Sequence, residues 1–375
     1  MKIAFLDPID WDYTPFTPLE RPLDGSQSAI CYLTPELAAL GHEVTLINGV
    51  SSPGVYAGVR CPGRAGTLTA EYLNQFDVVI GVNSAVGVKL REGGVTAPLV
   101  LWSQQATDQK DIQELRGADE RLAWSAFFLV SNWQAAGYVS EFGIRPDRIA
   151  VLRNAAAPVF QSLERRTQPF FRTGKPPVLV YTSTPFRGLL LLLLSFPLIR
   201  QAIPECRLRV FSSMGVYQQS SEREPLYHSL YALARALPGV EYLGSVSQTA
   251  LASALATADM LAYPNVFPET SCITVMEAMA AGCLVCTSRL GALPETTAGF
   301  GFLMDLPADI LQMAQAFVAL VVGIYRDACA APDRFEDAIT RQRAYAREHY
   351  TWAARAREWA TALPRVLRQA RAPAS

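Results

Sequence analysis

The sequence predicts an α/β protein built from two doubly wound parallel-sheet domains. The chain has 375 residues, which is enough for two domains that each bury a core. Short β-rich runs alternate with longer helical segments, an order typical of parallel sheets covered by helices. This alternation is interrupted between Pro158 and Pro177, where the chain is polar, arginine-rich and punctuated by proline. We interpret the interruption as a linker between two domains.

The first half of the chain opens with a β–α–β unit. A helix is predicted over residues 29–40, because apolar residues recur at helical spacing and Gly41 is well suited to end a helix. The loop 7–25 precedes this helix and is expected to overhang a cleft between the domains. The strands predicted in this half are 2–6, 43–47, 78–81, 99–102, 127–130 and 147–152.

The second half repeats the alternation. The apolar run Leu189–Leu194 fits a buried helix, and no apolar run reaches the roughly 18 residues that span a bilayer. The stretch 334–371 is helical and rich in arginine, and we interpret it as a solvated helix face rather than a membrane patch. The predicted strands are 178–182, 208–212, 240–243, 260–263 and 284–287, and the predicted helices lie near 187–202, 223–236, 248–257 and 272–281.

The expected domain boundaries follow from this pattern. Residues 1–158 form the first domain, 159–175 the linker and 176–351 the second domain, and the helix 352–375 packs back on the first domain.

Composition excludes several classes of protein. The chain is 50% hydrophobic and 18% charged, which excludes a disordered chain, and its net charge of −1 gives no field for nucleic acid. Seven scattered cysteines indicate reduced thiols, and Cys283 and Cys286 are expected to be buried rather than metal-binding. Three histidines are too few for a His-rich metal site. We expect a cytoplasmic protein with no metal, no cofactor, no nucleic-acid partner and no transmembrane segment. Peripheral membrane contact and the oligomeric state stay open.

The segment from Phe267 to Gly282 carries the clearest chemical signal. It follows a predicted strand, passes through a proline-marked loop and enters a helix whose first N–H groups can bind phosphate oxygens. Glu269 and Glu277 are a little over two helical turns apart, so both carboxylates can face one pocket and accept hydrogen bonds from sugar hydroxyls. An acidic helix cap plus a solvated glutamate explains the pattern equally well.

These residues resemble the Glu-x7-Glu motif of the retaining family-4 glycosyltransferases of GT-B fold (glycosyl transferases group 1). Other segments follow the order of that family, namely 41–46 (GHEVTL), 130–133 (VSNW), 151–154 (VLRN), 290–295 (LGALPE) and 299–303 (GFGFL). The resemblance covers residues 1–310. It implies a GT-B fold, in which two Rossmann-like domains face a cleft.

The resemblance also implies roles for single residues. Glu269 would contact hydroxyls of the donor sugar, Glu277 would bind the nucleotide ribose, and Arg187 would bind the diphosphate. Thr182 stands where the family has a second basic residue. Glu269 and Arg187 are therefore the catalytic candidates. The donor-binding candidates are Gly25, Ser26, Arg187, Ser245, Val246, Glu269, Thr270, Ser271, Cys272, Ile273, Thr274 and Glu277.

Candidates for the acceptor side lie in two loops of the first domain. Exposed aromatic side chains and carboxylates in the loop 7–25 would suit a sugar or polyol acceptor, and an irregular loop packed on its own aromatics is an equal alternative. Asp10-Trp11-Asp12 also spells DxD, a metal motif of the unrelated GT-A enzymes, but its place directly after the first strand argues against a metal site. Many relatives carry a histidine after the strand that corresponds to 99–102, where this chain has glutamines. The acceptor candidates are Asp10, Trp11, Asp12, Tyr13, Gln104, Gln105 and Asp108.

The resemblance implies a retaining glycosyltransferase that moves a sugar from a nucleotide-diphospho-sugar to a hydroxyl of a glycan, glycolipid or small molecule. A front-face mechanism without metal tolerates the missing histidine, because the departing phosphate oxygen takes the acceptor proton. A UDP-sugar is the first candidate donor and a GDP-sugar the next. The alternatives are a catalytically degenerate nucleotide-sugar-binding subunit and a sugar-nucleotide epimerase of GT-B fold.

Overall fold

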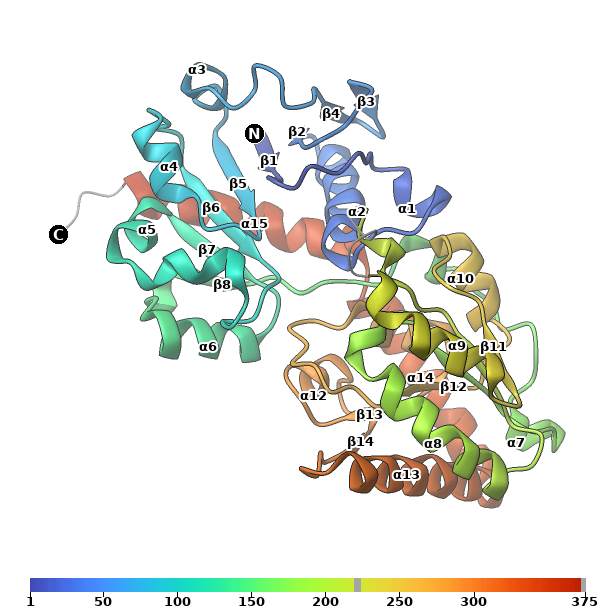
Figure 1. Ribbon diagram of the computed structural model, residues 1–375. Helices are drawn as coiled ribbons and strands as arrows, with labels where there is room; N and C mark the ends of the chain where they lie inside the picture. Colours follow the sequence, from blue (N-terminus) through green and yellow to red (C-terminus); the bar gives the residue numbers. More distant parts are fainter. Residues whose placement is uncertain (219–223, 372–375) are drawn as a thin grey trace. The chain divides into compact units, whose positions relative to one another are not determined.

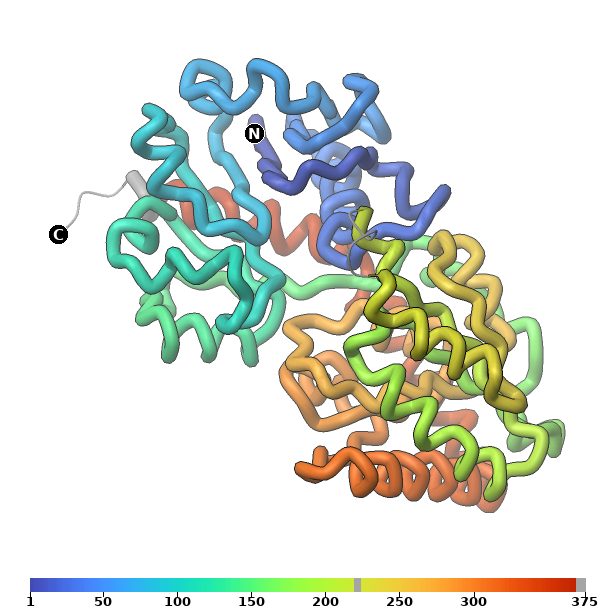
Figure 2. Tube along the Cα trace, viewed as in Figure 1, coloured from blue at the N-terminus to red at the C-terminus, as the bar shows by residue number. Residues whose placement is uncertain are grey.

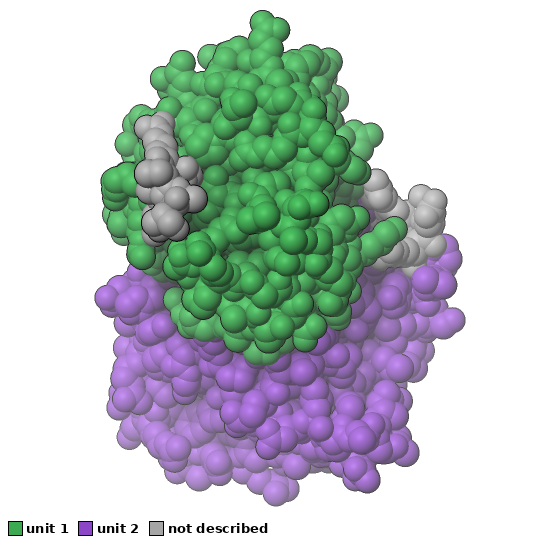
Figure 3. Space-filling view, turned by 90° about the vertical axis from the view of Figure 1, so that its left-hand side faces the viewer, with its two compact units in different colours: residues 1–17, 25–154, 352–375 green, residues 18–24, 155–351 purple. Residues whose placement is uncertain are grey.

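The computed structural model describes residues 1–218 and 224–371 and contains two compact units, each with its own sheet (Figure 1). Unit 1 consists of residues 1–17, 25–154 and 352–375, and unit 2 consists of residues 18–24 and 155–351 (Figure 3). The predicted α/β class with two doubly wound sheets is confirmed.

Unit 1 is built on an eight-stranded sheet with the order β3-β4-β2-β1-β5-β6-β7-β8. The central strand β1 pairs in parallel with β2 and β5, so that Ile3 lies opposite Val44 and Val78. These strands are rich in valine, isoleucine and leucine because helices cover both faces of the sheet. The strands are β1 (Lys2–Leu6), β2 (Glu43–Ile47), β3 (Gly54–Tyr56), β4 (Val59–Cys61), β5 (Val78–Val82), β6 (Leu99–Ser103), β7 (Ala126–Leu129) and β8 (Ile149–Val151).

One edge of this sheet differs from the prediction of purely parallel strands. β3 and β4 form an antiparallel hairpin, in which Tyr56 lies opposite Val59. Ala57 and Gly58, the two residues between them, have φ angles of +50° and +81°. Positive φ at both turn positions is what a tight two-residue hairpin requires. The sequence signal is weak because alanine rarely adopts this conformation.

The first long helix also begins earlier than predicted. It starts at Gly25 rather than at residue 29, and the short helix α1 lies within the stretch predicted as a loop. The helices of unit 1 are α2 (Gly25–Ala39), α3 (Ala70–Leu73), α4 (Gly87–Glu92), α5 (Ala118–Ala123), α6 (Asn132–Phe142) and α15 (Trp352–Arg371), with 3₁₀ turns η1 (Lys110–Arg116) and η2 (Pro146–Arg148). α1 (Thr17–Glu20) crosses the division between the units.

The C-terminal helix α15 belongs to unit 1 although the chain reaches it last (Figure 2). Its buried Trp359 packs against Phe5, Trp102 and Phe128, with ring centroids 5.6, 5.0 and 4.9 Å apart. The arginines of this helix were expected to lie on a solvated face, and this is confirmed for only some of them. Arg357 and Arg365 are exposed, whereas Arg355 is buried and forms an ion pair with Glu358 at 3.1 Å.

Unit 2 is built on a six-stranded sheet with the order β11-β10-β9-β12-β13-β14. Every pairing in it is parallel. The carboxyl ends of β9 and β12, the two central strands, therefore lie side by side and carry the loops that hold the donor candidates. The strands are β9 (Val178–Tyr181), β10 (Arg207–Val210), β11 (Val240–Tyr242), β12 (Met260–Tyr263), β13 (Leu284–Ser288) and β14 (Phe302–Met304).

The predicted helices of this half are present with small shifts at their ends. Residue 223, the predicted start of the helix before β11, lies outside the described residues. The helices are α7 (Phe170–Thr173), α8 (Leu189–Ala202), α9 (His228–Ala236), α10 (Gln248–Leu255), α11 (Ile273–Ala281), α12 (Leu293–Thr296), α13 (Ile310–Ala330) and α14 (Pro332–His349), with 3₁₀ turns η3 (Pro158–Phe160), η4 (Pro185–Arg187), η5 (Met214–Val216) and η6 (Glu224–Tyr227).

Two apolar helices of unit 2 depart from expectation. In α8, Leu190 and Leu194 are 45% and 39% exposed, so the leucine run is only partly buried. α13 is long and apolar enough to cross a membrane, judged by length and composition alone. It packs against α8, and a core helix of a soluble protein passes the same test.

The stretch predicted as a linker is attached to unit 2. Arg165 donates to the backbone carbonyl of Gly282 at 2.9 Å and to the buried Asp259 carboxylate at 3.2 Å. Asp259 also accepts from the backbone N–H of Val178, the first residue of β9, at 2.9 Å. Burial raises the pKa of Asp259, and these hydrogen bonds counteract the rise. The stretch is thus fixed by specific polar contacts.

Candidate functional site

Glu269 lies in the loop between β12 and α11 and is nearly fully buried. Its Oε1 accepts from the Tyr263 hydroxyl and, at 2.7 Å, from Nη1 of Arg187. The same Arg187 nitrogen contacts Oε2 at 2.9 Å. The structure therefore brings the two catalytic candidates into one ion pair and adds a tyrosine that was not among the candidates.

Arg187 ends the short turn η4 after β9, and two phenyl rings flank it. Its guanidinium carbon lies 5.6 Å from the ring centroid of Phe186 and 5.0 Å from that of Phe267. Burial acts to lower the pKa of Arg187, but the neighbouring Glu269, Tyr263, Tyr217 and Asp24 raise it well above its usual value. Within the part of the chain that the structure describes, Nε of Arg187 is buried without a hydrogen-bond partner.

Gly188, directly after Arg187, explains why this turn lies so close to the neighbouring strand end. Its φ is +133°, and a Cβ atom there would lie 2.2 Å from the backbone oxygen of Pro264. Only glycine fits this approach. The turn that carries Arg187 is therefore held against the residue that follows β12.

Glu277 lies in the second turn of α11 and is 2% exposed. Burial raises its pKa to about 8, although a hydrogen bond from the backbone N–H of Ala157 lowers it. Its Oε1 has no hydrogen-bond partner among the described residues. A buried carboxylate oxygen without a partner is costly in the free protein and is available to a ligand hydroxyl.

The helix α11 begins without a side-chain cap. Cys272 occupies the N-cap position and makes no capping hydrogen bond. Thr270, Ser271 and Cys272 are buried, whereas Ile273 and Thr274 are half-buried. Thr274 donates its hydroxyl to the backbone oxygen of Thr182 at 2.9 Å, so the start of α11 and the end of β9 are neighbours. An uncapped helix start beside Arg187 is suited to phosphate oxygens.

Ser245 and Val246 follow β11 and are half-buried. The hydroxyls of Ser245 and Ser213 form a hydrogen bond of 2.5 Å, which joins the loops after β10 and β11. Tyr242, at the end of β11, donates to the backbone oxygen of Ser212 at 2.7 Å. These residues lie at the same edge of the sheet as Arg187, on neighbouring strand ends.

In unit 1, the expectation of exposed aromatic side chains in the loop 7–25 is wrong for two residues. Trp11 and Tyr13 are 4% and 0% exposed, and only Phe16, at 43%, reaches the surface. Tyr13 donates its hydroxyl to the buried Asp7 carboxylate at 2.5 Å, and Gln27 donates to the same oxygen at 3.1 Å. Burial raises the pKa of Asp7. The loop is packed on its own aromatics, as in the alternative interpretation.

The other candidates of this loop lie at its surface or in the helix. Asp10 forms an exposed ion pair with Arg64 at 3.5 Å, and Asp12 accepts from the Ser51 hydroxyl at 2.7 Å. Gly25 and Ser26 are not in a loop but in the first turn of α2. The early helix start changes their expected conformation.

After β6, a network of carboxamides stands at the position where the family resemblance led us to look for a histidine. The backbone N–H of Gln104 donates to Asn83 at 2.7 Å, and Asn154 donates its amide to the Gln104 side chain at 2.8 Å. Gln105 donates to Asp111 at 3.3 Å. Asp108 is exposed and accepts from Gln109 at 3.2 Å. This network can position hydroxyls but contains no imidazole.

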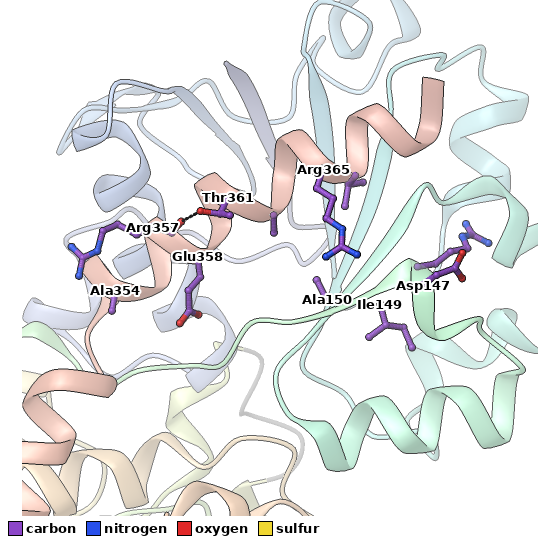
Figure 4. Close-up of a pocket in the computed structure, with 11 residues that line it drawn as sticks. Asp147, Ile149, Ala150, Ala354, Arg357, Glu358, Thr361 and Arg365 are labelled. Atoms are coloured by element: carbon purple, nitrogen blue, oxygen red, sulfur yellow. Dashed lines mark hydrogen bonds between the residues drawn. The ribbon is translucent and has the colours of Figure 1, made fainter. Parts of the chain in front are cut away.

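A separate groove of about 550 Å³ lies in unit 1 between β8 and α15 (Figure 4). Ile149, Ala150, Ala354 and Val366 contribute its apolar surface, and Arg357 and Arg365 lie at its rim. None of the candidate residues lines it. It is therefore distinct from the donor candidates of unit 2.

The cysteines and the possible metal ligands were predicted to form neither disulfides nor a metal site. All seven cysteines are free, and burial raises the pKa of both Cys283 and Cys286 to about 12, as expected for buried thiols. Across residues 1–218 and 224–371, no group of three or more histidine, cysteine, aspartate or glutamate side chains is arranged to hold a metal ion.

Three residues that contact or lie near candidate residues of their own unit were missed from the sequence. Tyr263 ends a buried strand, where an aromatic residue is ordinarily interpreted as core. Asn83 has a φ of +54° at the end of β5, and asparagine tolerates that conformation. Tyr217 lies near Arg187 in a loop with no motif. Only Asn83 carried a usable signal, since asparagine after a strand often makes such a turn.

Comparison with family models and with curated proteins gives one match. Residues 176–322 match the family described as glycosyl transferases group 1. No curated protein matches the sequence.

Solved structures resemble the whole chain at low sequence identity. A sucrose-phosphate synthase from Thermosynechococcus elongatus is 16% identical with a TM-score of 0.68, covering 97% of this chain and 98% of its own. A glycosyltransferase from Rickettsia africae is 13% identical with a TM-score of 0.70, covering 98% of both chains. Anabaena HepE, solved with UDP-glucose, is 16% identical with a TM-score of 0.66, covering 97% of this chain and 100% of its own.

These likenesses establish the fold, and the family match lies on the unit that holds Arg187, Glu269 and Glu277. The chain has the GT-B fold, and residues 176–322 within its second unit match the glycosyl transferases group 1 model.

Proposed function

We propose that this protein transfers a sugar from a nucleotide-diphospho-sugar to a hydroxyl acceptor. The proposal rests on two buried polar atoms of unit 2, one donor and one acceptor, that have no hydrogen-bond partner among the described residues. Nε of Arg187 is a buried donor without a partner, and Oε1 of Glu277 is a buried acceptor without one, among the described residues. A nucleotide diphosphate supplies phosphate oxygens for the first and ribose hydroxyls for the second.

We propose a role for each group. Arg187 uses Nη1 for Glu269, which leaves its Nε side for phosphate oxygens, and the uncapped start of α11 adds backbone N–H groups. Glu277 receives the ribose, and Glu269 accepts from a hydroxyl of the transferred sugar. We propose UDP as the first base to test, since HepE was solved with UDP-glucose.

We further propose a retaining, front-face reaction without metal. The bond from the anomeric carbon to the phosphate oxygen breaks, the bond to the acceptor oxygen forms on the same face, and the departing phosphate oxygen takes the acceptor proton. Arg187 stabilises the charge that develops on the leaving diphosphate. The carboxamides around Gln104 are consistent with positioning rather than general-base chemistry.

Calorimetric titration with UDP, GDP, ADP and dTDP, each with and without EDTA, tests the proposal. We expect one nucleotide to bind with an affinity that EDTA does not change. Glu277→Ala should weaken that binding about 10- to 100-fold, the loss expected for hydrogen bonds to a charged group. Glu269→Ala should leave binding of the free nucleotide intact.

Two outcomes would change the conclusion. Binding of none of the nucleotides would overturn the donor assignment. Binding without donor cleavage or transfer to any acceptor would favour a nucleotide-sugar-binding subunit, an alternative that Thr182, in place of a second basic residue, keeps open.

A further inference from the structure

We propose that Tyr263 is a positioning residue that fixes Glu269 so that a single acceptor position is left for the donor sugar. The inference rests on the proposed function. It concerns a residue that no motif marks, at the carboxyl end of β12.

The first step is a count of the hydrogen bonds on Glu269. An ionised carboxylate has about four acceptor positions, two on each oxygen. Tyr263 and Arg187 both donate to Oε1, and Arg187 also contacts Oε2 at 2.9 Å. Contacts with described residues therefore occupy three positions in the free protein, and the remaining one lies on Oε2.

The second step is that Tyr263 itself has little freedom. Its side chain is fully buried, its ring lies 5.7 Å from that of Tyr181, and its hydroxyl lies 3.4 Å from the Ser183 hydroxyl. Burial and the Glu269 charge both raise its pKa well above the usual value, so it remains a donor at neutral pH. A rigid neutral donor holds the carboxylate in one orientation.

The third step concerns the backbone of Glu269. Its carbonyl accepts from the N–H of Ala292 at 2.7 Å, and Gly291 packs directly against it. The backbone is thus held from one side and the carboxylate from the other. Because both acceptor positions of Oε1 are used, Glu269 can accept a hydrogen bond from one sugar hydroxyl, through Oε2.

Tyr181 provides a matched control. It is also fully buried and lies beside Tyr263, but its hydroxyl donates to the backbone oxygen of Thr184 at 2.8 Å rather than to Glu269. Tyr263→Phe and Tyr181→Phe remove the same atom at the same depth, and only the first touches the carboxylate.

The test measures Kd by calorimetry for UDP and for UDP-glucose in the intact protein and in both variants. Tyr263→Phe should raise the Kd for UDP-glucose about tenfold and change the Kd for UDP by no more than about twofold. UDP binding is spared because the Nε of Arg187 is still available to phosphate oxygens and Glu277 is unchanged. Tyr181→Phe should change the Kd for UDP and the Kd for UDP-glucose by the same factor. Thermal melting of each variant checks that the fold is retained.

A double-mutant cycle separates positioning from general damage. In a Glu269→Ala background, which removes the acceptor of the Tyr263 hydroxyl, Tyr263→Phe should have no further effect on the affinity for UDP-glucose. Three results would each overturn the positioning role. Tyr263→Phe could lower the affinities for UDP and UDP-glucose equally, or it could leave the affinity for UDP-glucose unchanged. The third result is a cycle in which the losses of affinity are additive. If the intact protein binds neither ligand, the proposed function fails and this inference falls with it.

Discussion

Glu277 is the residue whose free and ligand-bound environments should differ most. Its carboxyl is buried in α11 with a pKa raised to about 8, whereas an unfolded glutamate titrates near 4.3. Between these values the folded protein holds one proton more than the unfolded chain. The free energy of unfolding therefore falls as pH rises through this window and levels off above about pH 8.

Replacement by glutamine should remove this slope. Glu277→Gln is expected to be more stable than the intact protein at pH 8, by on the order of 4–5 kcal/mol, and nearly equal at pH 4.5. Urea denaturation across this range measures the effect. Nucleotide binding should release protons at pH 7 in the intact protein, since ribose hydroxyls favour the ionised carboxylate, and calorimetry in two buffers detects the release.

Glu120 is the control for this prediction. It is also buried, but it accepts from the backbone N–H groups of Gly87 and Val88 and from the Trp124 indole, at 2.6, 2.8 and 2.7 Å. Glu120→Gln should destabilise at every pH, because its amide cannot accept all three bonds. A Glu277→Gln variant that behaves in the same way would contradict the absence of a partner for Oε1 of Glu277 among the described residues.

At the scale of elements, the loop β13–α12 positions the loop β12–α11 through one glycine. Gly291 has a φ of +59°, and a Cβ atom there would lie 2.5 and 2.7 Å from the backbone oxygen and nitrogen of Glu269. Gly299 also has a positive φ, of +83°, but a Cβ atom there would meet nothing within 4 Å. The two positions share the conformational cost and differ only in the clash.

Alanine at each position should therefore separate the two effects. Gly299→Ala should cost about 1–2 kcal/mol of stability and leave nucleotide-sugar binding unchanged. Gly291→Ala should lower the stability more than Gly299→Ala does and should also weaken the binding of UDP-glucose, because the backbone of Glu269 has to move. Urea denaturation and calorimetry measure both. Equal behaviour of the variants would mean that Gly291 does not position Glu269.

Element order was predictable from the sequence, whereas packing at the strand ends was not. Strands such as Lys2–Leu6 and Met260–Tyr263 were predicted with correct bounds because buried parallel strands are continuous apolar runs. The pair Glu269 and Arg187 came from the motif order. Tyr263 was missed, and the burial of Trp11 was only one of two equal interpretations, because a contact between a strand end and a loop leaves no periodicity in the sequence.

At the scale of the whole molecule, the two units have separate sheets and separate cores. Unit 1 depends on a segment from the far end of the chain, since Trp359 of α15 packs on Phe5, Trp102 and Phe128. The proposed ribose, phosphate and sugar contacts, Glu277, Arg187 and Glu269, all belong to unit 2. A change in α15 and a bound nucleotide should therefore act on different unfolding transitions.

Scanning calorimetry should show this as two transitions with independent responses. Trp359→Ala should destabilise unit 1 by about 3–5 kcal/mol, the cost of deleting a buried large aromatic side chain. UDP at a hundred times its Kd should stabilise unit 2 by about 2.7 kcal/mol. Leu122→Ala, at a position 74% exposed in α5, should change neither transition. If UDP raised only the transition that Trp359→Ala lowers, the donor contacts would belong to unit 1 and the assignment of Arg187, Glu269 and Glu277 would fail.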